Sequence, residues 1–180
     1  GKLDKACKKY EVKKLKSVGC DTIVRKVNAR MQLIKKVWSF GSSYQEMVHL
    51  WKTFSLNILE QSCAVWGGMI TSENKKDLER TQKNFAKLVL QEKYSTYKSA
   101  LLSLGLESLE TRRKKLTLTF AKTSIADGHF RGLILKKRPR NGPDTRHQEY
   151  YQVTRAHTER FRKSPILTMQ RLLNEDQKKR

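Results

Sequence analysis

The chain has 180 residues, with 39 lysines and arginines against 17 aspartates and glutamates, so its formal net charge is +22. This excess opposes compaction by self-repulsion and favours a polyanionic partner, nucleic acid first, although an acidic membrane surface or acidic protein tails would satisfy the charge alone. The hydrophobic fraction of 37% excludes a large core, and no apolar run approaches the roughly 20 residues that a membrane span needs.

Residues 1–20 form a basic arm that is dominated by lysine and has few apolar anchors. The arm is either a solvated, partly disordered segment or a basic segment that follows a phosphate backbone. Asp21 can cap the helix that follows, which we expect to run to about Trp38. Its apolar residues recur at spacings of three and four and form one seam, made of Val24, Val27, Met31, Ile34 and Trp38. The opposite surface carries Arg25, Gln32 and Lys36.

Residues 43–66 predict a second helix, around which the other helices are expected to pack. Ser43 and Glu46 fit a capping box, and Gly67 and Gly68 are expected to end the helix through a left-handed glycine. A broad apolar stripe indicates burial on more than one side, and it comprises Met47, Leu50, Trp51, Phe54, Ile58, Leu59 and Val65. Because only a short turn precedes this helix, the first two helices should pack antiparallel.

A third helix is expected to open at Thr71 or Ser72 and to reach Leu90. Its inward residues are Leu78, Phe85, Leu88 and Val89. Its outward residues are basic, namely Lys75, Lys76, Arg80, Lys83 and Lys87. This face is either the ordinary charged surface of an exposed helix or a face that contacts phosphates. Three helices with short links predict a compact bundle over residues 21–90.

Residues 91–130 predict two further helices. Ser95 can cap a short helix that Gly105 closes, and Ser108 can cap a longer one that ends near Asp127, before Gly128. The apolar side of the longer helix is expected to contain Leu109, Leu116, Phe120 and Ile125. Its first turn holds Arg112 and Arg113, which either contact phosphates or form local ion pairs with nearby glutamates.

Residues 131–163 hold two prolines before position 146 and a cluster of bases, and they predict an exposed basic linker. The linker is either simply solvated or a phosphate-contacting loop, and its candidate bases are Lys136, Lys137, Arg138 and Arg140. Ser164 and Pro165 then start a C-terminal helix over residues 164–180. Its apolar residues are Ile166, Met169, Leu172 and Leu173, and its last six residues are expected to fray.

The chain contains almost no strand-like alternation, so the sequence predicts an all-α fold. It shows no spacing typical of a zinc site or a phosphate-binding loop, and no carboxylate cluster of the kind that holds two metal ions. Cys63 lies on an apolar helix and is expected to pack as a small hydrophobe. We therefore expect no catalytic residue, no metal and no cofactor in this chain.

The three tryptophans fall on expected core faces, so they are poor candidates for stacking on bases. Better candidates for contacts with sugar or base lie nearer to basic loops, and these are Tyr94, Tyr97, Tyr150 and Tyr151. The three cysteines are scattered and odd in number, and no signal-peptide pattern opens the chain, which favours an intracellular protein, nuclear or cytoplasmic.

Four motifs in the chain follow one another in an order that resembles a known family. They are VNARMQL at 27–33, ILEQSCAVW at 58–66, LERTQK at 78–83 and LGLESLETRR at 104–113. The order and spacing are similar to those in the C-terminal part of reverse transcriptases from non-LTR (LINE-type) retrotransposons, particularly the jockey-like clades. The resemblance covers residues 22–174.

The resemblance implies the thumb and post-thumb region of an RNA-directed DNA polymerase, which grips the template–primer duplex through its backbone. It also implies the rest of the reverse transcriptase as a partner, and Mg²⁺ only in a palm domain. The palm's metal-binding FADD or YADD motif has no counterpart here, and neither have the YLG-type strand before the thumb and the endonuclease found at the start of such elements. The chain is then a fragment, a decayed copy or a domesticated remnant of an element.

Three functions remain open on the sequence. In a nucleic-acid-binding thumb, Arg25, Gln32 and Lys36 would lie along the duplex backbone together with the outward bases of the third helix. A basic helical interaction protein, or a nonfunctional remnant, would bind polyanions through charge alone. An enzyme in its own right would need a carboxylate cluster assembled from distant positions.

Overall fold

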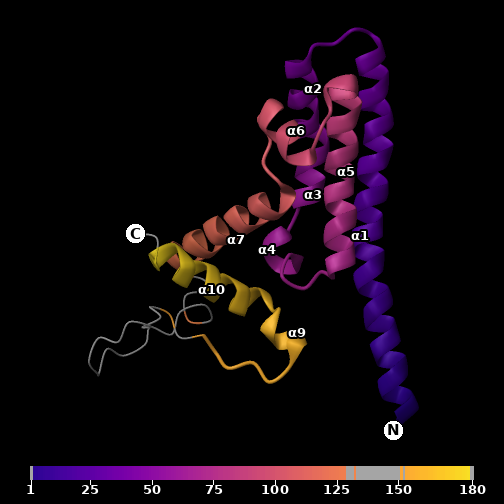
Figure 1. The fold of residues 1–180 in the computed structure, drawn as a ribbon. Coiled ribbons are helices and arrows are strands. Elements are labelled where there is room, and N and C mark those ends of the chain that lie inside the picture. The colour runs from indigo at the N-terminus through magenta and orange to yellow at the C-terminus, as the bar shows by residue number, and fades with distance from the viewer. Residues whose placement is uncertain (1, 129–131, 133–150, 152, 179–180) are drawn as a thin grey trace. The chain divides into compact units, whose positions relative to one another are not determined.

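The structure is a computed structural model that describes residues 2–128, 132, 151 and 153–178, with side chains from residue 20 onward (Figure 1). Its regular elements within these ranges are all helical, which confirms the predicted all-α class. The four candidate bases of the linker lie outside the described residues, namely Lys136, Lys137, Arg138 and Arg140.

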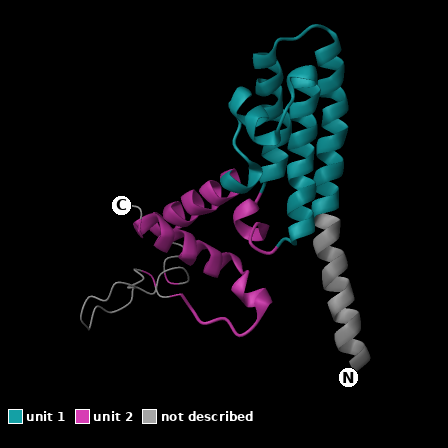
Figure 2. Cartoon of the chain, in the orientation of Figure 1, with its two compact units in different colours: residues 1–61, 70–111 teal, residues 62–69, 112–180 magenta. Residues whose placement is uncertain are grey.

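The chain divides into two compact units (Figure 2). Unit 1 consists of residues 1–61 and 70–111, and unit 2 of residues 62–69 and 112–180. This division differs from the segments expected from the sequence, because residues 62–69 leave the expected three-helix bundle and belong to unit 2.

Unit 1 is a bundle in which three helical segments run side by side (Figure 1). Its elements are α1 (Lys2–Ser39), α2 (Tyr44–Leu50), the π-helix η1 (Trp51–Leu56), α3 (Asn57–Glu60), α5 (Ser72–Leu90), the 3₁₀-helix η2 (Gln91–Lys93) and α6 (Tyr97–Ser103). The α1 helix contacts α5 on the one hand and α2, η1 and α3 on the other. The predicted antiparallel packing of the first two helices is therefore confirmed.

The α1 helix is longer than the sequence predicted. It is continuous from Lys2, so the predicted helix start at Asp21 is wrong. Nothing before Asp21 breaks a helix, because the segment has no proline and its lysines and leucines favour helix, while Gly19 costs only about 1 kcal/mol. The predicted seam of α1 is confirmed by the burial of Val27, Met31 and Ile34.

The predicted second helix is broken into shorter pieces. Its start is as expected, since Ser43 Oγ accepts a hydrogen bond from the Glu46 amide and the Ser43 amide donates to Glu46 Oε2 at 2.7 Å. Its continuous course to Trp66 is wrong, because Ser62 has a left-handed backbone with φ of 53°. Gly67 has φ of −59°, so the predicted left-handed glycine ending is also wrong.

The burial along this segment differs from the predicted stripe at two positions. Trp51 and Leu59 are fully buried, but Phe54 is 52% exposed and Val65 is 53% exposed. A π-helix closes its hydrogen bonds over five residues and so rotates less per residue than an α-helix. The η1 segment thereby shifts the phase of a stripe spaced for 3.6 residues per turn, and Ser55 becomes fully buried instead of Phe54.

The α5 helix begins and ends where the sequence predicted. Thr71 caps it by accepting a hydrogen bond from the Asn74 amide at 3.2 Å. Among the predicted inward residues, Leu78 and Phe85 are fully buried. Phe85 stacks on Trp51 with ring centroids 4.5 Å apart and an interplanar angle of 13°, so the core of unit 1 lies between α5 and η1.

The two helices after α5 are capped almost as predicted. The cap of α6 is Thr96, one residue beyond the predicted Ser95, and Gly105 follows with a left-handed φ of 59°. Ser108 Oγ accepts from the Thr111 amide at 3.2 Å, so the predicted cap of the next helix is confirmed. This helix, α7 (Leu109–Ala126), begins in unit 1 and continues into unit 2.

In its described residues, unit 2 contains most of α7 together with α4 (Cys63–Trp66), α9 (Glu159–Arg162) and α10 (Pro165–Lys178). Gly68 allows the segment after α4 to approach α10 closely, since a Cβ there would lie 2.6 Å from Thr168 Oγ1. A small apolar cluster holds the unit together, made of Ala121, Tyr151, Met169 and Leu173. Cys63 is buried, as predicted.

The buried side of α7 in unit 2 is more polar than predicted. Leu116 and Phe120 are 38% and 42% exposed, whereas Arg113 and Thr117 are buried. The predicted apolar side is therefore wrong at Leu116 and Phe120. On the buried side of α7, Ala121 and Ser124 have small side chains that let other segments pack closely against the helix.

The α10 helix starts at Pro165 as predicted, and it extends through Lys178. The predicted fraying is wrong up to Lys178, because Asp176 forms an ion pair with Lys122 of α7 at 2.8 Å. The last two residues lie outside the described part of the chain.

Candidate nucleic-acid interface

The α5 helix displays most of its predicted bases to solvent. Lys76, Arg80, Lys83 and Lys87 are exposed, and Lys75 is half-buried. With 3.6 residues per turn, the four exposed bases fall on the side of the helix opposite Leu78 and Phe85. The packing of the apolar residues therefore fixes the direction in which these bases point.

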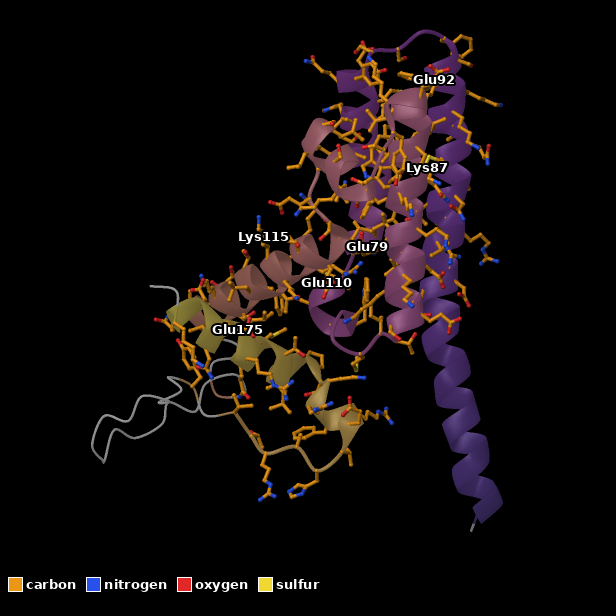
Figure 3. The ribbon with its side chains drawn as sticks, viewed as in Figure 1. Glu79, Lys87, Glu92, Glu110, Lys115 and Glu175 are labelled. Atoms are coloured by element: carbon orange, nitrogen blue, oxygen red, sulfur yellow. The ribbon has the colours of Figure 1, made fainter. Side chains whose placement is uncertain are left out.

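The helix also carries three acids, Glu73, Asp77 and Glu79, and Glu73 is exposed one turn before Lys76. Asp77 pairs with Arg80 at 3.2 Å, and both side chains are substantially exposed, so the pair contributes little stability. Glu79 is directed towards the two helices that follow α5. Its Oε2 accepts from the Tyr97 hydroxyl at 2.6 Å, and its Oε1 accepts from the Glu110 amide at 2.8 Å (Figure 3).

Glu79 thus supplies a carboxylate to the positive N-terminal end of α7, where negative charge is favourable. One turn away, Gln82 donates from Nε2 to the Glu107 carbonyl at 2.8 Å. These two side chains fasten the connection between α6 and α7 to one side of α5. The exposed bases are consequently carried on a helix that is fixed by polar contacts as well as by its apolar core.

One base of α5 also contacts an aromatic ring. Lys87 Nζ lies 5.6 Å from the ring centroid of Tyr94, within the range of a cation–π contact. Among the tyrosines predicted to contact a nucleobase or sugar, Tyr97 donates a hydrogen bond to Glu79, and Tyr151 is buried. The prediction for Tyr151 is therefore wrong, and Tyr150 lies outside the described residues.

The α1 helix supplies the second set of residues predicted to contact the duplex backbone. Arg25, Gln32 and Lys36 are all exposed, as expected for the side opposite the seam. Between residues 20 and 39 the sequence contains five bases and one acid, Asp21. Because α1 packs directly against α5, the structure brings two base-bearing helices together within unit 1.

The bases at the start of α7 divide into two kinds. Arg113 is only 5% exposed, which removes it from the surface, and Arg112 is half-buried. Lys114 and Lys115 are exposed, and our sequence reasoning did not single them out. The run RRKK at 112–115 is the sequence signal that indicates them.

Other kinds of site are not found among the described residues. No group of three or more histidines, cysteines, aspartates or glutamates there is arranged to hold a metal ion. None of the described helices combines the length and the apolar character needed to cross a membrane. Cys20 and Cys63, the two cysteines whose side chains are described, are both buried.

Comparison of the chain with protein-family models, with curated proteins and with solved structures gives no match.

Proposed function

We propose that this chain is the thumb and post-thumb region of a non-LTR retrotransposon reverse transcriptase, which grips the backbone of a template–primer duplex. The observation that carries the proposal is the exposed basic face of α5. Its four bases point away from the core, while Glu79 is drawn into contacts on another side of the helix. The order of the four sequence motifs supports the same assignment.

The arrangement suits recognition of a phosphate backbone. On an α-helix that rises about 1.5 Å per residue, Lys76, Lys83 and Lys87 are spaced by about 10 Å and 6 Å along the axis. They can therefore form charge-assisted hydrogen bonds with several phosphates of one strand. Such contacts position a duplex without reading its sequence, as a polymerase that copies any template requires.

The proposal assigns this chain binding and no catalytic step. The chemistry would belong to a palm domain of the same polymerase, which would hold Mg²⁺, so the remainder of the reverse transcriptase is a proposed partner. No cofactor is proposed for the chain itself. Its proposed nucleic-acid partner is an RNA–DNA hybrid, an RNA or a DNA.

The alternative function is binding through charge alone, as in a basic interaction protein or a remnant that no longer serves a polymerase. The net charge of +22 supports this alternative equally well. The two functions differ in shape recognition, because a thumb should distinguish the A-form-like geometry of a hybrid from a flexible polyanion.

A binding series separates the two functions. The full chain is titrated with an RNA–DNA hybrid, duplex DNA, single-stranded RNA and heparin at increasing salt. A thumb should retain a preference for the hybrid at about 0.2 M salt, where purely electrostatic binding is strongly weakened. Equal affinity for all four, lost together as salt rises, would favour binding through charge alone.

A pair of triple variants tests the assigned face. Lys76→Gln, Lys83→Gln and Lys87→Gln together should weaken hybrid binding and lower the slope of log affinity against log salt by about 3. The matched control replaces three exposed lysines on other elements of unit 1, Lys52, Lys93 and Lys98, and changes the net charge equally. Equal losses in both variants would contradict a specific role for α5.

A further inference from the structure

Phe54 is an aromatic residue displayed on the surface of the π-helix η1. Its side chain is 52% exposed, although both Trp51 and Ser55 beside it in the same element are fully buried. An exposed phenylalanine costs free energy relative to a buried one, and here the change of helical phase places it outside the core. π-Helical segments inside α-helices occur frequently at functional sites.

Polar side chains hold the backbone of η1 in this conformation. Thr53 Oγ1 donates to the His49 carbonyl at 2.9 Å, and Asn57 Nδ2 donates to the Thr53 carbonyl at 2.9 Å. The carbonyl of Phe54 itself accepts a hydrogen bond from the guanidinium of Arg30 on α1. The position of the Phe54 backbone is therefore fixed from both its own helix and its neighbour.

The contact with Arg30 also identifies which part of α1 lies next to Phe54. Lys26 and Leu33, four residues before and three residues after Arg30, share its side of the helix, and both are exposed. Leu33 is 61% exposed. Phe54 and Leu33 are thus exposed apolar side chains on the two elements that the Arg30 contact joins. Lys26 and Arg30 supply positive charge on the same side of α1, on a stretch whose one acid, Asp21, lies five residues before Lys26.

We propose that Phe54 is a stacking platform for an unpaired base of a bound nucleic acid, with Lys26 and Arg30 beside the adjoining phosphates. An aromatic ring flanked by cations suits the binding of a single strand, because nucleobases stack on the ring and basic side chains attract the phosphate backbone. The proposal rests on the proposed function and adds a contact with single-stranded template next to the gripped duplex.

The test compares a blunt RNA–DNA hybrid with the same hybrid carrying a short single-stranded extension of the RNA template. The full chain should bind the extended hybrid roughly fivefold more tightly, the lower end of what stacking of one base contributes. Phe54→Leu should remove this difference and leave binding of the blunt hybrid unchanged. Phe54→Trp should retain it.

Two controls define the cause of the change. Phe120→Leu removes a ring that is 42% exposed on α7 and should leave the preference for the extension intact. Lys26→Gln should lower the salt slope by about 1, whereas Phe54→Leu should lower affinity for the extended hybrid at an unchanged slope, because stacking releases no counterions.

The result that overturns the platform is equal preference for the extension in Phe54→Leu and in the unmodified chain. Failure of the platform is distinguishable from failure of the proposed function, because the latter appears as loss of hybrid preference over heparin in the unmodified chain.

Discussion

Among the described residues, the core of unit 1 consists mainly of large apolar side chains and includes three buried polar residues, Ser55, Thr81 and Gln82, whereas unit 2 combines a small apolar cluster with five buried polar residues. In unit 1, Trp51 and Phe85 stack inside the bundle and are both fully buried. In unit 2, Tyr151 and Asn174 pair through the Tyr151 backbone, which donates to Asn174 Oδ1 at 2.8 Å and accepts from Asn174 Nδ2 at 3.0 Å. Other polar residues buried in unit 2 are Arg113, Thr117, Ser124 and Gln170.

Because of this difference, we expect the stability of the two units to respond to different substitutions. Apolar packing loses stability in proportion to the cavity that a truncation leaves. A buried hydrogen bond contributes modestly while it is intact, but removing one partner leaves the other buried and unsatisfied, which costs more. Unit 1 should therefore be sensitive to loss of volume, and unit 2 to loss of single polar atoms.

The largest expected effect is that of Trp51→Ala. The substitution removes a fully buried ring and its stacking on Phe85, so the free energy of unfolding should fall by about 3–5 kcal/mol. Urea denaturation followed by helical circular dichroism measures the loss. Leu102→Ala, at a side chain that is 77% exposed, is the control and should change stability by less than about 0.5 kcal/mol.

Asn174→Ala should give the next largest effect, on unit 2. It leaves a buried backbone N–H and a buried carbonyl of Tyr151 without their partner, which should cost about 2–3 kcal/mol. Asn57→Ala in unit 1 breaks an exposed hydrogen bond instead and is the matched control. In Asn174→Ala, amide hydrogen exchange should become faster in α10 and not in α5. Equal acceleration in both helices would show that the effect of the substitution is not confined to unit 2.

Gly68→Ala tests close packing within unit 2. The added Cβ would lie 2.6 Å from Thr168 Oγ1 and 2.9 Å from the Lys163 carbonyl, so the segments must separate, at a cost of about 1–3 kcal/mol. Thr168→Ala removes one of the two close atoms. The double variant should therefore lose less stability than the sum of the single variants, and strict additivity would show that the contact with Thr168 does not limit the packing.

The smallest expected effect concerns two exposed glutamates, one in each unit. Hydrogen bonds from the Ser43 backbone and hydroxyl lower the pKa of Glu46, and hydrogen bonds from Arg162 and then Lys163 lower the pKa of Glu159. A lowered folded pKa contributes stability that is present above the ordinary value of 4.5 and is lost as pH falls through the folded value.

Ser43→Ala removes the side-chain cap of α2, which should cost roughly 1 kcal/mol. The variant keeps the backbone amide that donates to Glu46 and loses only the hydroxyl, so it should reduce the loss of stability below pH 4.5 only in part. Glu159→Gln should change only the acid end of the profile, because its ion pairs with Arg162 and Lys163 are exposed. Denaturation at a series of pH values measures both. A pH profile unaltered by Ser43→Ala would show that the Ser43 hydroxyl does not contribute to the acid dependence of unit 1.

The candidate site was predictable from sequence to the extent that it lies on regular helices. The exposure of Arg25, Lys36, Lys83 and the other bases follows from the 3.6-residue period, which holds throughout α5 and the described part of α1. Phe54 was not predictable in this way. Its exposure depends on the π-helix, whereas the 3.6-residue period predicted that Phe54 lies in the core.

The all-α class, the bounds of α5 and the capping box at Ser43 follow from the sequence alone, because they depend on residues close together along the chain. The change of helical phase in η1, the place of α4 in unit 2 and the burial of Arg113 rather than Leu116 depend instead on packing. These outcomes depend on which distant segments meet. A hydrophobic pattern states that a side of a helix will be covered, but not which neighbour covers it or where that neighbour alters the helix.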